Sequence, residues 1–490
     1  MKQLVVLLIL LFSSLSGISQ NITAKIIDQN TKNPIPFAAI KTDEFNGVIS
    51  NEEGYFTLLE TAEETEITIS CLGYKNKTLS IEAIKTQNFI ITLEESINEL
   101  NTVYISSKKP NVDSIIALAR QNLSKNYANK LYKHEVFSRE TAFIDFKKLD
   151  FVIEKTSHVK KKNLESANQS LDSLSRAIVK SKTRHFKDFK ATLWVNDSLK
   201  TKLLVDKATE LVDQKNDLSI EEVQKKAQHI ILKYLDTTLT YKLKTGMFKI
   251  EDSLSLNEDF GDENDKNEYD TDNLKGQTNY LLKRSQFYEN SMLSKILDAR
   301  FYNYSFQDIS FFNNELIYVI NYRPKKSKSK YTGKIFITDA SYAVTKVDFE
   351  YAEGKRGSKV NLKLLLGVKY IENMRKGTVL FQKDTTNIYH PYYIKFEEGR
   401  YFYVSRPLKF IENSKDRNKT SFDFTVEGNI LTKQELLLTE NTKISQALFN
   451  EQTEVKKVPY IILNKYDASI WDQDQTIEPL QEMKDFKGGE

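Results

Sequence analysis

Five histidines are the residues of this sequence best suited to metal or acid–base chemistry: His134, His158, His185, His229 and His390. Metal-dependent hydrolases often place two histidines four residues apart on one helix face, with a glutamate beside them. No two histidines here have that spacing, and none is followed three residues later by Glu. His134 and Glu135 fall within a predicted strand, where adjacent side chains point to opposite faces. The sequence therefore predicts no zinc-carboxypeptidase or metalloprotease site, and no metal ligand.

Motifs for nucleophilic hydrolysis and nucleotide binding are absent from the sequence. Serine hydrolases often hold the nucleophile in a Gly-x-Ser-x-Gly turn, and the nearest candidate, Gly357-Ser358, lacks the second glycine. There is no glycine-rich phosphate loop and no dinucleotide fingerprint. A pair of glycosidase-type carboxylates is defined by its folded distance and stays open. We predict no catalytic residue and no cofactor, and expect that the protein is not an enzyme.

Cys71 is the only cysteine, so it cannot form a disulfide within the chain. It follows an alternating strand pattern in which Ile67, Ile69 and Cys71 share one face. We expect Cys71 to fill core space as a small apolar residue. A reactive thiol would need a basic, partly exposed setting, for which the sequence gives no sign.

Two charged segments could bind ions or lipids. Residues 257–273 are acidic, and calcium takes such oxygen ligands, but the spacing lacks the glycine and terminal glutamate of an EF-hand loop. We expect an acidic loop here and leave calcium binding open. The basic run 160–162 is interpreted as a solvated helix or loop surface. Contact with anionic lipid headgroups or lipopolysaccharide is the alternative.

Aromatic side chains are the candidate binding residues, because Tyr and Phe offer broad, stiff contact area. The ligand is unknown, and ordinary sheet packing is the alternative for each ring. The candidates are Tyr389, Tyr392, Tyr393, Tyr401 and Tyr403.

The first residues predict the compartment of the protein, and the charge balance bears on its partners. A short positive start, the apolar run Leu4–Phe12 and small residues before Gln20 are typical of a signal peptide over residues 1–19, cleaved near Ser19. We therefore expect export, to the periplasm or in association with the outer membrane. No later stretch is apolar for long enough to be a membrane helix. With 71 basic and 67 acidic residues, the charge balance does not favour nucleic acid as a partner.

Residues 20–95 contain short alternating segments separated by turn residues. Asn46-Gly47 and Glu53-Gly54 are hairpin signals, because glycine accepts positive φ. Six or seven short strands with turns at regular spacing predict a β-sandwich.

This region resembles the carboxypeptidase-type regulatory domain, a transthyretin-like sandwich. The resemblance rests on five elements in order: Ile26-Ile27-Asp28, Pro34–Ile40, Gly47–Ser50, Glu53–Phe56 and Cys71–Tyr74. It implies an accessory module of exported envelope proteins that docks or spaces a neighbouring domain. It does not imply peptidase activity.

The remaining chain is predicted to be mainly β with α+β parts. We expect a linker over 96–110, a mixed helix and strand region over 111–300, and an antiparallel β-rich region over 301–490. Helices are expected over 111–127 and 203–235, and strands over 136–153, 392–396 and 400–404.

Three functions remain possible for this sequence. The first is a non-catalytic envelope protein that binds or scaffolds another envelope protein or a glycan through its sandwich and its C-terminal sheet. The second is a lipid or lipoprotein carrier, because the strands over 331–337 and 343–349 resemble the meander of carrier half-barrels that hold acyl chains. The third is a hydrolase without a recognisable motif.

Overall fold

The chain forms two compact units in the computed structural model. The first unit draws on residues 1–100, 310–315 and 467–482, and the second on 101–309, 316–466 and 483–490. The structure describes residues 21–42, 47–59, 66–96, 110–127, 131–157, 160–196, 198–213, 225, 229, 232–246, 248–256, 268–313, 315–384, 386–472 and 474–488. Part of the acidic stretch 257–273, the predicted signal peptide and most of the predicted linker therefore lie outside the described residues.

The first unit contains a β-sandwich, as its turn spacing predicts. Within the described residues one sheet has the order β4-β1-β7 and the other β3-β2-β5-β6. A short helix, α2 (Ile81–Thr86), connects β6 to β7. The strands are β1 (Ile22–Asp28), β2 (Ala39–Lys41), β3 (Gly47–Ile49), β4 (Tyr55–Leu58), β5 (Glu66–Ser70), β6 (Lys77–Ser80) and β7 (Ile90–Leu93).

The sandwich core consists of apolar side chains, most of them isoleucines. Alternate residues of β1 point inward, so Ile22, Ala24 and Ile26 are buried. Cys71 packs against this core and is partly buried, which confirms its predicted role. Gly54 takes a φ of +80°, and a Cβ there would lie 2.5 Å from the carbonyl oxygen of Ile26. Only glycine suits this turn.

A segment close to the end of the sequence packs on the sandwich within the first unit. The side-chain amide of Asn51 donates to the carbonyl oxygens of Glu478 and Pro479, at 3.1 and 3.2 Å. The hydroxyl of Thr57 donates to the Glu478 carboxylate. Trp471 and Ile477 are buried, Trp471 at the end of a 3-10 helix, η1 (Ala468–Trp471). The sandwich therefore joins residues more than 400 positions apart in the chain.

The second unit is built on one large sheet of fourteen strands, counted over the described residues. Its main path has the order β14-β15-β16-β17-β19-β20-β21-β8-β9-β10-β23, and its strands pair mainly antiparallel, whereas β10 and β23 are parallel. The path strands are β8 (Tyr132–Thr156), β9 (Thr183–Val195), β10 (Thr201–Leu211), β14 (Tyr302–Phe312), β15 (Glu315–Pro324), β16 (Tyr331–Thr338), β17 (Val344–Tyr351), β19 (Val368–Lys383), β20 (Tyr389–Glu412), β21 (Lys419–Lys443) and β23 (Ile461–Leu463).

Shorter elements complete this unit. Three strands pair off the main path: β11 (Thr240–Thr245), β12 (Phe248–Ser255) and β18 (Lys359–Leu362). A separate pair is formed by β13 (Glu268–Asp270) and β22 (Lys457–Pro459). The described helices are α4 (Val112–Gln121), α5 (Leu123–Asn126), α6 (Lys161–Lys180), α9 (Thr271–Arg284), α10 (Met292–Ile296), α11 (Lys363–Leu366) and α12 (Gln446–Glu451). A last helix, α13 (Gln481–Lys484), begins in the residues of the first unit and ends in those of the second.

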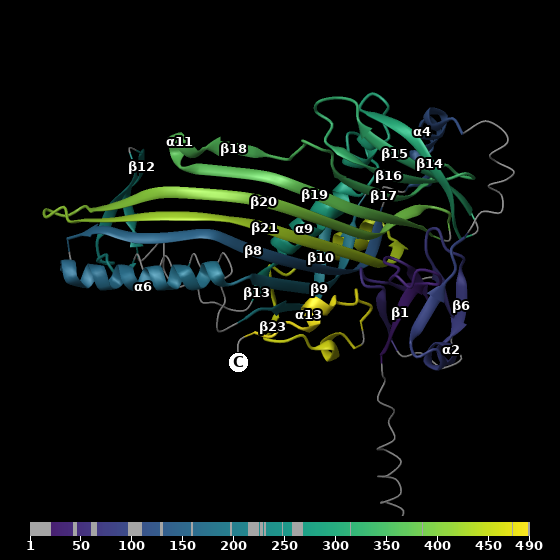
Figure 1. The fold of residues 1–490 in the computed structure, drawn as a ribbon, viewed down its shortest axis with the longest axis horizontal. Helices are drawn as coiled ribbons and strands as arrows, with labels where there is room; N and C mark the ends of the chain where they lie inside the picture. Colours follow the sequence, from purple (N-terminus) through teal and green to yellow (C-terminus); the bar gives the residue numbers. More distant parts are fainter. Residues whose placement is uncertain are drawn as a thin grey trace, which may run out of the picture. The chain divides into compact units, whose positions relative to one another are not determined.

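Three neighbouring strands, β20, β21 and β8, are unusually long. Each has 24 or 25 residues, which at the usual rise corresponds to about 80 Å. They run side by side along their length (Figure 1). The two strands predicted over 392–396 and 400–404 are in fact one strand, β20, which continues through Gly399.

Helix α6 covers an edge that β9 leaves open. Strand β9 pairs with β8 only up to Ile144, and α6 then lies along the rest of β8 (Figure 1). Leu171, Ser175 and Ile178 are buried on its inner face. The Asn168 amide accepts from the backbone N–H of Ile153 and donates to its carbonyl oxygen. Covering an edge in this way blocks pairing with another chain.

The predicted fold class is confirmed, and the helices expected over 203–235 are partly wrong. The segment that begins at Leu203 lies in strand β10, because it pairs with β9 along its length. The helix expected over 111–127 and the strand over 136–153 are confirmed by α4, α5 and β8. Among the described helices, none has the length and apolar character that a membrane crossing requires.

Candidate functional site

A pocket of about 570 Å³ opens in the second unit. It lies where the end of α9, helix α10, the start of β14, the loop between β15 and β16, and strand β19 meet. We call it the basic pocket. It is lined by Lys283, Arg284, Tyr288, Asn290, Ser291, Met292, Lys295, Phe301, Tyr302, Lys328, Ser329, Lys330, Tyr331 and Arg375.

The lining is strongly cationic. Five Lys or Arg side chains line the pocket in addition to Arg375, and no carboxylate or histidine is among the lining residues that the structure describes. Lys283, Lys295 and Lys328 are exposed. Like charges at this density repel one another, and an anion that binds among them relieves this repulsion.

The last turn of helix α9 contains two of the cationic side chains that line the pocket. Asp270 caps its N-terminus by accepting from the backbone N–H of Asp272. Leu274, Leu281 and Leu282 are buried and fix the face that packs inward. Lys283 and Arg284 then fall in the last turn. Cations are favoured there by the partial negative charge of the helix C-terminus.

Rings hold two of the cationic groups in place. The Arg284 guanidinium carbon lies 3.8 Å from the centroid of the Tyr280 ring. The ammonium nitrogen of Lys328 lies 5.1 Å from the centroid of the Phe301 ring. Cation–π contacts of this kind orient a charge without neutralising it. Both groups therefore keep their charge for a ligand.

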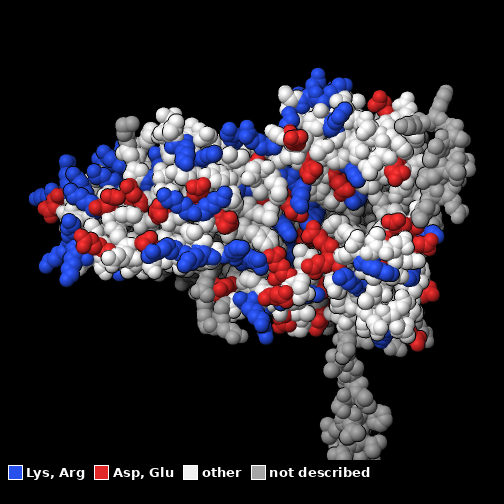
Figure 2. Space-filling model, in the orientation of Figure 1, with Lys and Arg blue, Asp and Glu red and all other residues white. Residues whose placement is uncertain are grey.

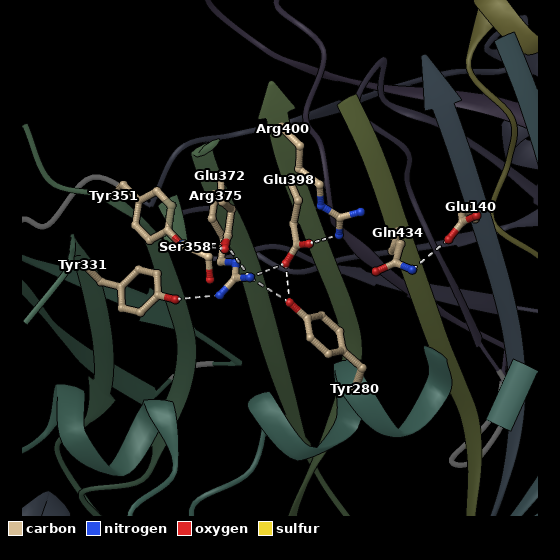
Figure 3. A network of polar contacts seen from close by, with 10 residues as sticks. All are labelled: Glu140, Tyr280, Tyr331, Tyr351, Ser358, Glu372, Arg375, Glu398, Arg400 and Gln434. Carbon is tan, nitrogen blue, oxygen red and sulfur yellow. Dashed lines mark hydrogen bonds and ion pairs between the residues drawn. The ribbon is translucent and has the colours of Figure 1, made fainter. Parts of the chain in front are cut away.

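Beside these cations lies a network of polar side chains centred on Arg375 (Figure 3). Its Nη2 lies 2.6 Å from Glu372 Oε1 and 2.8 Å from Glu398 Oε1. Its Nη1 donates to the Tyr331 hydroxyl at 3.1 Å. The positive charge of Arg375 is thus matched by carboxylates, so the net charge of the pocket comes from the other five cations.

Tyrosines and a second arginine complete the network. Nη2 of Arg375 also donates to the Tyr280 hydroxyl, which donates in turn to Glu398. Arg400 holds the second oxygen of Glu398 at 2.6 Å. The Tyr351 hydroxyl donates to Glu372. Further along the sheet, Gln434 donates to Glu140 (Figure 3).

An irregularity in β19 makes this network possible. Residues three apart in a regular strand point to opposite faces, yet Glu372 and Arg375 form an ion pair. The register between β19 and β20 shifts between Glu372 and Met374, and the extra residue of the bulge turns both side chains to one face. Gly399 lies opposite, where a Cβ would come within 2.9 Å of the Met374 Cβ.

The charge state of Glu398 is set by its neighbours. Burial on its own would raise the pKa of this carboxyl group. The hydrogen bond from Tyr280 and the positive charges of Arg375 and Arg400 outweigh burial and lower the pKa below its ordinary value. Glu398 therefore stays ionised and holds the network together at neutral pH.

Two of the five histidines come together in the second unit. The ring centroids of His134 and His390 lie 6.3 Å apart. His390 Nε2 lies 3.0 Å from Asp384 Oδ2, and His134 Nδ1 contacts Asn441. The two strands that carry them, β8 and β20, both pair with β21. The spacing of histidines in the sequence gives no sign of this proximity, which depends on the strand order.

Both histidines of this pair have a lowered pKa because both are buried. Burial lowers the pKa of His134 to about 4, although its hydrogen bond to Asn441 acts in the opposite direction. Burial also lowers the pKa of His390, which hydrogen-bonds to Asp384. Over the described part of the chain, no cluster of three metal-ligating side chains occurs.

The five candidate tyrosines do not line the basic pocket. Tyr389, Tyr392 and Tyr393 are at most 7% exposed, so they serve as packing residues and cannot offer an open surface. Tyr401 and Tyr403 are half-buried, and Tyr401 donates to Glu427. Burial on both faces of β20 explains why the first three rings are hidden.

Sequence reasoning does not identify the pocket residues as a site. The run 325–330 contains four lysines, and its pattern predicts only a turn between two strands. Its density of positive charge is the one local signal that points to a binding surface. The proximity of this loop to the end of α9 and to Arg375 appears only in the folded chain.

The family model of the CarboxypepD_reg-like domain matches residues 22–105. This stretch is a CarboxypepD_reg-like domain. The match confirms the resemblance seen in the sequence, and the matched type is regulatory. No curated protein matches the chain. The basic pocket lies wholly outside the matched residues, so the match carries no information about its ligand.

Proposed function

We propose that this chain is a non-catalytic cell-envelope protein that binds an anionic glycan in the basic pocket. The observation that carries the proposal is the lining of five Lys or Arg side chains without a carboxylate among the described lining residues. Lys and Arg donate strong, charge-assisted hydrogen bonds to phosphate, sulfate and carboxylate groups. The rings of Tyr288, Phe301 and Tyr331 beside them provide apolar faces against which a sugar ring can pack.

Two further features support an envelope role. The first residues have the pattern of a signal peptide, and the regulatory-type domain implies a module that docks or spaces a neighbour. In this proposal the sandwich positions the protein and the second unit supplies the ligand site. A hydrolase commonly uses a histidine or a carboxylate as its acid or base, and the described lining of the basic pocket contains neither.

The test is titration of the purified protein with sulfated dextran and with unmodified dextran, followed by calorimetry. We expect sulfated dextran to bind, unmodified dextran not to bind, and affinity to fall as salt is raised. Lys283→Gln and Lys330→Gln should each weaken binding about tenfold, because each removes a hydrogen bond to a charged group.

Lys334→Gln is the matched control. Lys334 is exposed on the same strand as Tyr331 but does not line the pocket, so its loss removes the same charge from another place. Equal weakening by Lys330→Gln and Lys334→Gln would show that only overall charge matters and would contradict the proposal. So would the absence of binding to sulfated dextran.

A further inference from the structure

Among the described residues of the second unit, the two most exposed large apolar side chains lie on a hairpin tip. Helix α11 joins strand β18 to strand β19 and contains no buried residue. Leu364 is 102% exposed and Leu365 is 79% exposed, far beyond what a leucine shows on an ordinary surface. Val360 and Leu362 on β18 are also exposed. No fold requirement explains four such residues in one short segment.

A second hairpin brings two more apolar residues to the same place. Strand β19 pairs with β20 as far as Val404, and β11 pairs with β20 from Lys409 onward. The turn after α11 and the turn between β11 and β12 therefore meet at the same edge of β20. The Arg406 guanidinium lies 5.8 Å from the ring centroid of Phe248, and the Ser405 N–H donates to the Gly367 carbonyl oxygen.

We call this surface the tip patch. Its two β11–β12 members, Phe248 and Ile250, are 50% and 53% exposed. In Figure 2 uncharged side chains project at the place that Figure 1 labels α11, with Lys and Arg around them. The tip patch consists of Val360, Leu362, Leu364, Leu365, Phe248 and Ile250.

Positive charge surrounds these apolar residues. Residues 354–371 contain five Lys or Arg and no Asp or Glu. Lys363 lies over the Tyr403 ring at 4.0 Å, and Lys409 is exposed on β20. The carboxylate of Asp252, on β12, contacts Lys249 and Lys242. The border of the tip patch is therefore cationic around α11, whereas around the β12 members the exposed Glu251 lies beside Lys249 and the charge is mixed.

The same end of the sheet carries the basic run 160–162. The Ser157 N–H donates to the carbonyl oxygen of Lys419, at the start of β21. The run that follows in the chain is exposed. Lys415 and Arg417, in the turn between β20 and β21, are exposed as well. The exposed charges in these two segments are therefore mostly positive, although Asp416 lies between Lys415 and Arg417.

We propose that this end of the sheet docks on an anionic lipid bilayer, with the tip patch inserted at the boundary between headgroups and acyl chains. Apolar side chains bordered by Lys and Arg are the combination that binds such an interface. The leucines leave water, and the lysines contact lipid phosphates. A glycan or a soluble anion would use the charges but leave the leucines exposed, so the apolar residues favour the bilayer.

Co-sedimentation of the full chain with vesicles tests this proposal. Vesicles of equal parts phosphatidylcholine and phosphatidylglycerol should bind the protein, and vesicles of pure phosphatidylcholine should bind it much more weakly. Leu364→Ser with Leu365→Ser should weaken binding by more than about tenfold, since each leucine loses the gain of leaving water. Lys359→Gln with Lys363→Gln should weaken it by more than about tenfold, at about fivefold for each lysine.

Two matched controls show whether the place of these side chains matters, and not merely the loss of a leucine or of positive charge. Leu448→Ser removes a leucine that is 46% exposed on α12 and should not change vesicle binding. Lys283→Gln with Lys330→Gln removes two charges from the basic pocket and should leave vesicle binding intact, so the two proposals can fail separately. Every side chain substituted in the test and in its controls is exposed, except Lys330. Circular dichroism checks that each variant folds.

Three results would overturn the proposal. One is absence of binding to the anionic vesicles. Another is binding that survives the double leucine substitution. The third is a dimer in analytical ultracentrifugation that the leucine substitutions dissociate, which would assign the tip patch to a second copy of this chain.

Discussion

The two units bury different kinds of side chain. The sandwich core is a single cluster of apolar residues, mostly isoleucines. Among the described residues, the charged groups that the first unit buries are the carboxylates Asp28 and Glu478, whereas the long sheet buries cations and histidines as well. Examples are the Arg139–Asp188 pair, Lys395 with Glu397, and the His134–His390 pair. The four histidines that the structure describes all belong to the second unit.

This difference suggests different roles: the sandwich serves as a scaffold, and the second unit holds charged side chains at fixed positions. An apolar core needs only volume and shape, and it tolerates many sequences. A buried charge needs a partner at a fixed distance. Each buried ion pair of the second unit therefore fixes the positions of its two side chains. The ion pairs around Arg375 do this for the basic pocket.

The two tryptophans allow each unit to be followed separately. Trp194 lies on β9 in the second unit and Trp471 lies in the first. Replacing one of them with phenylalanine leaves fluorescence from a single unit. Denaturant unfolding in these two backgrounds shows which unit a further substitution destabilises.

The largest effect is expected from Asp188→Ala. Arg139 Nη2 lies 2.6 Å from Asp188 Oδ2 and its Nε lies 2.9 Å from Oδ1, and both side chains are buried. Removing Asp188 leaves a buried charge without this partner, which costs about 4 kcal/mol of unfolding free energy. The Trp194 transition should shift and the Trp471 transition should not. A double change, Arg139→Met with Asp188→Leu, should recover most of the loss.

Ile40→Ala is expected to cost about 3 kcal/mol in the first unit. Ile40 is fully buried in the sandwich core, and its truncation leaves a cavity among apolar neighbours. The Trp471 transition should shift by the same amount at neutral and at mildly acidic pH. A loss that depends strongly on pH would show that the sandwich relies on a titrating group.

Acidification is expected to weaken the second unit by about 2 kcal/mol at about pH 5 through His134. Its pKa is about 4 in the folded chain and about 6.5 when unfolded. The unfolded chain therefore takes up a proton first as pH falls, and stability decreases between these two values. His134→Gln should reduce this pH dependence of the Trp194 transition. An unchanged profile would mean that His134 is not the group responsible.

The sandwich could be predicted from sequence because its signals are local. The alternation of Ile22, Ala24 and Ile26 and the turn at Gly54 identify strands and hairpins within a few residues. For the second unit, the sequence predicts the fold class, with a large antiparallel sheet, but not the order or the length of its strands. Gly399 lies between two predicted strands, yet β20 continues through it. The absence of a Cβ at Gly399 leaves room for Met374 at the bulge of the neighbouring strand β19.

The candidate site could not be predicted, because its parts are distant in the sequence. Lys283, Lys330 and Arg375 come from a helix, a loop and a strand that only the strand order brings together. Tyr393 is a sequence candidate for an exposed contact, but strand β20 is covered on both faces at that point, a property that the alternation of residues does not reveal. The proximity of His134 and His390 likewise depends on their shared neighbour, β21.

The segment that contains Glu478 has a consequence for the order in which the protein is made. The sandwich strands leave the ribosome before residues 467–482, which complete the first unit and follow residues 101–466 in the chain. Until these residues have been synthesised, the side chain of Asn51 therefore has no carbonyl from this segment to bind. The nascent sandwich is an incomplete unit for that time. Hydrogen exchange at the turn around Asn51, in a chain that stops before residue 467, should be faster than in the full chain.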